Sequence, residues 1–178
     1  MTSCTTSTLL LERMDCRMRD PIPGWDPPGA THRRRLLDNT ESIAIVGASS
    51  NPARASYFVA TYLMSSSAAY DVYLVNPRET EILGQPVYAS LADLPVVPDM
   101  VDVFRRSEDL PPIAEETAAI GAKVFWAQLG LWSADAAGIA ANAGLDVVMD
   151  RCTKIEHARF AGGLHLAGFD TGVINSRR

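Results

Sequence analysis

The chain has 178 residues, of which 47% are hydrophobic and 21% charged, and its formal net charge is −5. This length and hydrophobic content fit one domain with a sizeable core and exclude an assembly of several domains. The negative charge argues against a nucleic-acid surface, and no run of about 18 apolar residues is present to span a membrane. We therefore expect a globular protein that binds neither nucleic acid nor membrane.

The N-terminal segment lacks the pattern of a secretion signal. The leucines at 9–11 are too few for the apolar region of a signal peptide, and the acidic Glu12 follows them at once. The three cysteines, Cys4, Cys16 and Cys152, make no disulfide framework. We therefore expect a cytoplasmic protein.

Composition divides the chain into three parts. Residues 1–31 include a stretch rich in proline and glycine, which predicts a flexible extension without regular elements. Residues 32–160 carry the pattern of a folded domain, and residues 161–178 form a glycine-containing tail. The three arginines at 33–35 precede two leucines and are typical of the solvated face of a short helix.

Strand and helix patterns alternate from residue 42 onward. The apolar run at 43–46 predicts a strand buried on both faces, and apolar residues recur with helical spacing between 55 and 63. Further strands are predicted at 71–76, 99–104, 123–128 and 145–149.

Serine caps and glycine stops place helices between the later strands. Ser107 and Ser133 are suitable N-caps, and residues 151–160 predict a last helix or loop. Residues 79–94 are expected to be irregular, with at most one short helix. The alternation predicts an α/β fold: a single doubly wound Rossmann-type parallel sheet of about five strands with helices on both faces.

The segment between the first strand and its helix is suited to phosphate. Gly47 allows a sharp exit from the strand, Asn51 and Pro52 make a turn, and the following helix N-terminus offers unpaired N–H groups. The dinucleotide fingerprint requires two more glycines, where this chain has Ser49 and Pro52, so a wider loop than that of NAD proteins is indicated.

The end of the second strand also departs from the NAD pattern. Asn76, Pro77 and Arg78 stand where an acidic residue would bind the ribose, and Arg78 offers a cation to a second phosphate. Other cations that follow predicted strands or the first turn are Arg54, Arg105, Arg106, Arg151 and Lys154. Since the ends of parallel strands share one edge, we expect an anion to bind there.

Five segments together resemble the small single-domain bacterial CoA-binding proteins, which are related to the CoA-binding domain of the succinyl-CoA synthetase alpha subunit. They are VGASSNPARASY at 46–57, VNP at 75–77, DVFRR at 102–106, WAQLG at 126–130 and MDRCTKIE at 149–156. The resemblance covers roughly residues 32 to 160 and implies reversible binding of CoA or an acyl-CoA. Enzyme activity is not implied, because no counterpart of the synthetase's ligase domain or of an ATP-grasp domain is visible.

CoA joins a pyrophosphate to an adenosine 3′-phosphate, so its site needs two phosphate pockets. The turn at 47–52, with Ala48, Ser49 and Ser50 inside it, suits the pyrophosphate, and Arg54 adds charge at the helix start. Arg78 is placed to hold the 3′-phosphate, although a plain surface arginine is an equal alternative.

Aromatic and amide groups at later strand ends complete the expected site. Phe104 is suited to cover the adenine, while Arg106 is suited either to phosphate or to an ion pair with the acidic residues at 108–109. Trp126 and Gln128 share a strand face and are suited to the pantetheine arm, although a packed tryptophan is the commoner case. The expected ligand contacts are Gly47, Ala48, Ser49, Ser50, Asn51, Pro52, Arg54, Asn76, Pro77, Arg78, Phe104, Arg105, Arg106, Trp126 and Gln128.

Two other functions stay open from the residues. An NAD(P)-binding oxidoreductase or redox sensor would use Arg78 for a 2′-phosphate. Acyl transfer would use Cys152 as a thiolate, with His157 as its base, although a buried cysteine or a mixed disulfide with CoA needs fewer assumptions. No metal-ligand spacing appears, and the sequence leaves a homodimer open.

Overall fold

A parallel sheet built on the strand β1 (Ser42–Val46) forms the middle of the computed structural model, which describes residues 22–66 and 69–160. The strand pairs in parallel with β2 (Asp71–Val75) on one side and with β5 (Met100–Val103) on the other. Beyond β5 lie β6 (Val124–Ala127) and β7 (Asp146–Val148), also parallel. The α/β fold of Rossmann type is thereby confirmed.

Two short strands extend the sheet beyond β2. The strand β4 (Gln85–Tyr88) is parallel to β2, and β3 (Glu81–Ile82) is antiparallel to β4. The described sheet therefore has seven strands in the order β3-β4-β2-β1-β5-β6-β7, rather than about five. The prediction of an irregular stretch at 79–94 was wrong here, because strands of two and four residues are too short for a side-chain period to be visible.

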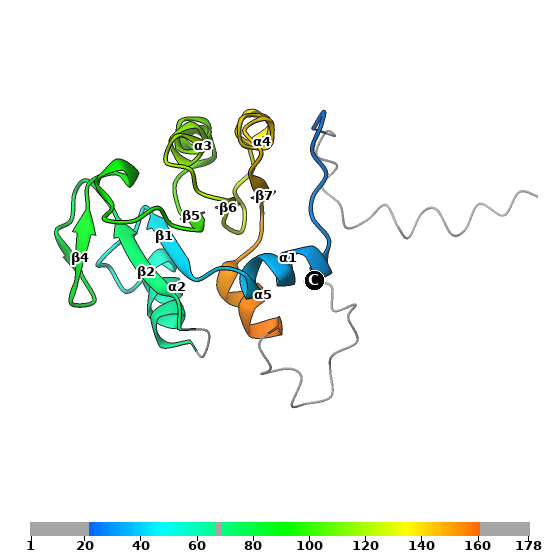
Figure 1. Ribbon diagram of the computed structural model, residues 1–178. Coiled ribbons are helices and arrows are strands. Elements are labelled where there is room, and N and C mark those ends of the chain that lie inside the picture. Colours follow the sequence, from blue (N-terminus) through cyan, green and yellow to red (C-terminus); the bar gives the residue numbers. More distant parts are fainter. Residues whose placement is uncertain (1–21, 67–68, 161–178) are drawn as a thin grey trace, which may run out of the picture.

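Helices cover both faces of the sheet, as predicted. One face packs against α1 (Ala30–Asp38), α2 (Ala55–Ser65) and α5 (Thr153–Phe160), and the other against α3 (Leu110–Ala119) and α4 (Ala134–Asn142) (Figure 1). None of the helices in the described part of the chain is long and apolar enough to cross a membrane.

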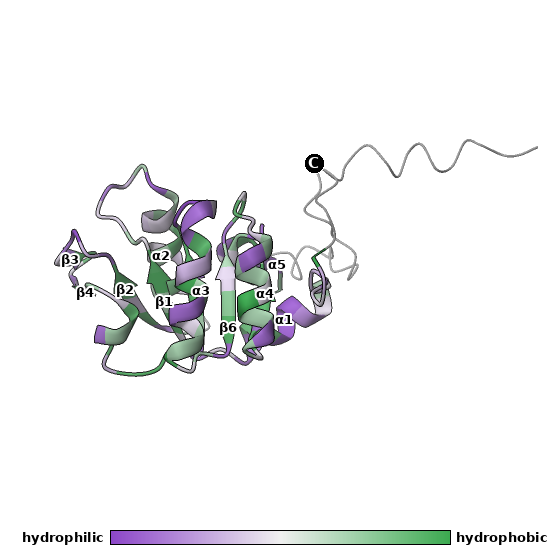
Figure 2. Ribbon diagram, turned by 90° about the horizontal axis from the view of Figure 1, so that it is seen from above, coloured by the Kyte–Doolittle hydropathy of each residue, from purple (hydrophilic) through white to green (hydrophobic). Residues whose placement is uncertain are grey.

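Strand alternation divides the core into two clusters. Ile43, Ile45 and Trp126 belong to the cluster under α1, α2 and α5, whereas Ala44 and Phe125 belong to the cluster under α3 and α4. In Figure 2 the strand β1 is coloured as hydrophobic, because both of its faces are buried, whereas α3 has both hydrophobic and hydrophilic residues. A strand covered on both faces reads as a continuous apolar run, which is why β1 was recognisable in the sequence.

One of the two predicted serine caps is confirmed. The Ser133 hydroxyl accepts the N–H of Ala136 at 3.2 Å and caps α4. The prediction was wrong for Ser107, whose hydroxyl accepts the N–H of Trp132 at 3.2 Å. A short 3₁₀ turn at Ser107–Asp109 precedes α3, and the proline pair lies in the first turn of that helix as expected.

Residues before α1 are packed on the domain. Ile22 and Trp25 join the core cluster under α3 and α4, and the Trp25 indole donates to the carbonyl of Val147 at 3.1 Å. This part of the expected extension is therefore integrated into the fold. Residues 1–21 and the expected tail at 161–178 lie outside the described residues.

Candidate functional site

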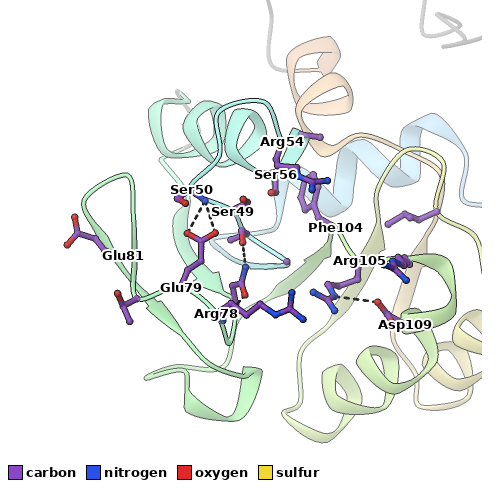
Figure 3. Close-up of a pocket in the computed structure, with 17 residues that line it drawn as sticks. Ser49, Ser50, Arg54, Ser56, Arg78, Glu79, Glu81, Phe104, Arg105 and Asp109 are labelled. Carbon is purple, nitrogen blue, oxygen red and sulfur yellow. Dashed lines mark hydrogen bonds and ion pairs between the residues drawn. The ribbon is translucent and has the colours of Figure 1, made fainter.

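The site is a cavity of about 1230 Å³ at the carboxyl ends of the central strands (Figure 3). Its walls are the segments that follow β1, β2 and β5. The chain runs outward from β1 to β2 on one side, and it returns to β5 on the other. The cavity thus opens where the strand order reverses, which is the usual ligand position in open α/β sheets.

Most of the expected ligand contacts meet in this cavity. The lining includes Gly47, Ala48, Ser49, Ser50, Arg54, Asn76, Arg78, Phe104, Arg105 and Arg106. It also includes residues that were not predicted from the sequence: Ala55, Ser56, Glu79, Thr80, Glu81, Asp109 and Leu131. Asn51, Pro52, Pro77, Trp126 and Gln128 lie outside the lining.

The turn after β1 is held by its neighbours in the sheet. Gly47 has a φ of +86°, and both its N–H and that of Ala48 donate to the carbonyl of Val75, at 2.9 and 3.3 Å. These two N–H groups, predicted from the sequence to face phosphate, are therefore engaged by β2. Within the turn, the N–H groups of Asn51, Ala53 and Arg54 are engaged as well. Donors for an anion must therefore come from Ser49, Ser50 and the start of α2, where the first N–H groups have no acceptor within the helix.

Asn76 joins two walls of the cavity. Its Nδ2 donates to the carbonyl of Ala48 at 2.6 Å, and its Oδ1 accepts the N–H of Arg78 at 2.9 Å. Since both side-chain atoms are engaged, Asn76 positions the turn and the Arg78 loop relative to one another.

Four arginines bring positive charge to the lining. Within the described residues, neither Arg54 nor Arg78 takes part in an ion pair. Arg105 pairs with Asp109 at 3.5 Å, and Arg106 pairs with Glu108 at 3.6 Å. These exposed pairs contribute little free energy, so a bound phosphate can compete for both guanidinium groups.

A carboxylate occupies the turn after β1. The N–H of Ser50 donates to both oxygens of Glu79, at 3.0 and 3.1 Å, and Figure 3 shows the carboxylate directed at the turn. Hydrogen bonds from the side chain and N–H of Ser50, and then from the side chain of Ser49, lower the pKa of Glu79. Glu79 lies further into the loop than the end of β2, where NAD-binding proteins carry their acidic residue, so its place in the sequence did not point to the site.

Trp126 and Gln128 are buried in the core, outside the cavity lining. The Trp126 indole donates to the carbonyl of Arg151 at 2.7 Å. Gln128 Nε2 donates to both oxygens of Asp102, at 2.7 and 2.8 Å, and Thr153 donates to the same carboxylate. The two residues share a face of the sheet, as expected, but the fold uses their polar atoms internally.

The two side chains considered for acyl transfer, Cys152 and His157, are packed within the fold. Burial raises the pKa of Cys152, which packs on the core cluster under α2 and lies outside the cavity lining. His157 Nδ1 is 2.9 Å from the hydroxyl of Tyr62, and burial lowers the pKa of the imidazole. Among the described residues, no group of His, Cys, Asp or Glu is arranged to hold a metal ion.

Known proteins share this sequence and fold. Residues 41–158 match the family model described as CoA binding domain. The chain is 39% identical over 131 residues to the uncharacterized protein YneT of Bacillus subtilis (strain 168), covering 74% of this chain and 96% of YneT. It also resembles the solved structure of a hypothetical protein from Pyrococcus horikoshii OT3, with a TM-score of 0.72 and 35% identity, covering 83% of this chain and 100% of that one.

A larger protein contains a related segment. The chain is 32% identical over 92 residues to the alpha subunit of acetate–CoA ligase (ADP-forming) I from Pyrococcus furiosus. This match covers 49% of the present chain and 20% of the ligase subunit.

Proposed function

Because the chain belongs to the family of CoA-binding domains, we propose that the cavity at the ends of β1, β2 and β5 reversibly binds coenzyme A or an acyl-CoA. One observation carries the proposal. The turn after β1 lines a cavity that arginines also line, and this cavity lies where the strand order reverses. The cavity volume of about 1230 Å³ exceeds the range of roughly 300–1,000 Å³ usual for drug-sized ligands, as a long nucleotide requires.

In this proposal the pyrophosphate lies against the first turn of α2. Ser49, Ser50 and Ser56 supply polar groups there, and Arg54 supplies a cation that no described carboxylate neutralises. The helix N-terminus adds a partial positive charge of roughly half an elementary unit. Oriented donors of this kind stabilise a diphosphate without a lysine.

The 3′-phosphate is assigned to the arginines on the opposite side of the turn. Arg78 and Arg105 extend into the same part of the cavity from the loops after β2 and β5 (Figure 3). A guanidinium group can bind a phosphate through two parallel hydrogen bonds, which suits a terminal dianion. Arg106 is a further candidate, since its partner Glu108 is exposed.

Apolar contacts for the rest of the ligand come from Phe104 and Leu131. Both line the cavity, whereas Trp126 is fully buried and lies outside the lining. We therefore transfer the role of apolar wall, which the sequence suggested for Trp126, to these two residues.

The alternative functions receive less support. Acyl transfer through Cys152 would need a thiolate at the cavity, but that thiol is outside the lining and its pKa is raised by burial. An NAD(P) site lacks the second and third glycines of its fingerprint. The proposal is accordingly one of ligand binding.

Isothermal titration of the full chain with CoA, acetyl-CoA and NADP tests the proposed function. We expect CoA or acetyl-CoA to bind with one site per chain and NADP to give no saturable heat. Binding of NADP without binding of either CoA compound would replace the proposal with the redox alternative.

A further inference from the structure

The turn proposed to receive the pyrophosphate already holds an anion that belongs to the protein. Both carboxylate oxygens of Glu79 lie within 3.1 Å of the Ser50 nitrogen, in a bifurcated hydrogen bond. Glu79 reaches this position from the loop after β2, on the same segment as Arg78. The carboxylate thus bridges two walls of the cavity.

A phosphate cannot use the Ser50 N–H while Glu79 does. The incoming ligand also meets the negative charge of the carboxylate at close range, where like charges repel strongly. Binding at the turn therefore requires Glu79 to withdraw, and the free energy of that displacement must come from other contacts of the ligand. A nucleotide that engages the turn and the arginines on the opposite side together makes more contacts than a free inorganic anion, so it can supply more of this free energy.

We infer that Glu79 is a specificity-determining residue, an internal anion that occupies the phosphate turn and that only a ligand with further contacts in the cavity displaces. This inference rests on the proposed function and adds to it the expectation that the wild-type site discriminates against free phosphate and pyrophosphate. The loop after β2 would then carry two residues with opposite effects: Glu79 competes with the pyrophosphate for the turn, and Arg78 binds the 3′-phosphate.

Glu81 provides a matched control. It lines the same cavity and carries the same charge, but within the described residues its carboxylate makes no hydrogen bond to the turn. Figure 3 shows its side chain directed away from Ser50. E81Q therefore removes one negative charge from the lining and leaves the hydrogen bonds between Ser50 and Glu79 in place.

The test is titration of the wild type, E79Q and E81Q with sodium pyrophosphate and with CoA, at about 0.15 M salt to screen distant charges. We expect E79Q to bind pyrophosphate about tenfold or more tightly than the wild type, and to bind CoA more tightly as well. E81Q should differ from the wild type by less than about threefold in both titrations. Equal pyrophosphate affinity in the wild type and E79Q, or equal gains in E79Q and E81Q, would overturn the inference.

Failure of the inference is distinguishable from failure of the proposed function. If the wild type binds CoA and E79Q shows no gain, the function stands and the role of Glu79 falls. If no variant binds CoA, the function falls, and the pyrophosphate titrations alone decide whether Glu79 blocks the turn. Should E79Q fail to fold, E79D provides a second variant, because its shorter side chain withdraws the carboxylate from Ser50 and should give an intermediate gain.

Discussion

Gly47 lies against Arg105: a Cβ built on Gly47 would be 3.0 Å from the Cδ of that arginine and 3.2 Å from the carbonyl oxygen of Phe104. The loops after β1 and β5 therefore touch through a position that has no side chain. Because Gly47 also has a φ of +86°, glycine satisfies two requirements here, the backbone conformation and the close approach. The relative position of two cavity walls depends on this contact.

Replacing Gly47 with alanine should therefore loosen both the fold and the site. We expect G47A to lower the free energy of unfolding by about 1 to 3 kcal/mol, through backbone strain and displacement of the Arg105 loop, and to weaken CoA binding. Urea denaturation and calorimetric titration measure the two effects. G138A is the control, since Gly138 lies within α4 with nothing within 4 Å of its added Cβ. It should leave stability unchanged or raise it by up to about 1 kcal/mol; similar losses in both variants would contradict this account of Gly47.

Arg33 anchors α1 to α5 through a buried ion pair. Its Nε donates to Glu156 at 2.8 Å, and only 8% of Arg33 and 1% of Glu156 are exposed. Glu156 also accepts from Arg159 at 3.0 Å, so R33A leaves the carboxylate one charged partner. The loss of the bond from Arg33 should lower the free energy of unfolding by about 2 kcal/mol. Arg34 pairs with Asp38 on the surface of the same helix, and R34A should cost less than about 1 kcal/mol in the same urea titration. Equal costs would show that the buried pair contributes no more than the exposed one.

Asp102 should make the free energy of unfolding depend on pH between about pH 4 and pH 7. Burial raises the pKa of this carboxyl to about 7, although hydrogen bonds from Gln128 and Thr153 act in the opposite direction. Between its unfolded pKa of 3.8 and this folded value, the folded state binds a proton that the unfolded state does not. The contribution of Asp102 to the free energy of unfolding should therefore fall as pH rises from about 4 to 7, and level off above that range.

Comparison with D102N isolates this effect. Urea denaturation from about pH 5 to pH 8 should show the stability of the wild type, relative to D102N, decreasing with rising pH. Parallel pH profiles for the two proteins would mean that Asp102 does not titrate in this range.

The sequence predicted the parts of the fold that depend on local pattern. Buried parallel strands such as β1 read as apolar runs, and the change of period after Gly47 marked the start of α2. Because parallel strands end at a common edge, the turn after β1 and the arginines after β2 and β5 could be assigned to one site without a structure.

What the sequence did not predict depends on contacts between distant segments. Arg33 looked solvated until Glu156, from the other end of the domain, was seen to pair with it. Gln128 looked available to a ligand, but Asp102 and Thr153 use its amide. Glu79 was overlooked because only the folded loop shows that its carboxylate returns to Ser50.

The measurement that tests the central claim most directly is a cycle of four CoA affinities: CoA and dephospho-CoA, each with the wild type and with R78A. If the cavity binds CoA with its 3′-phosphate at Arg78, removing that phosphate should weaken binding to the wild type by about 1 to 3 kcal/mol and should weaken binding to R78A by less, because Arg105 is then the remaining assigned partner. The arginine and the phosphate would then be coupled. Equal losses of affinity in both proteins would place the 3′-phosphate elsewhere, and the absence of CoA binding to the wild type would contradict the account as a whole.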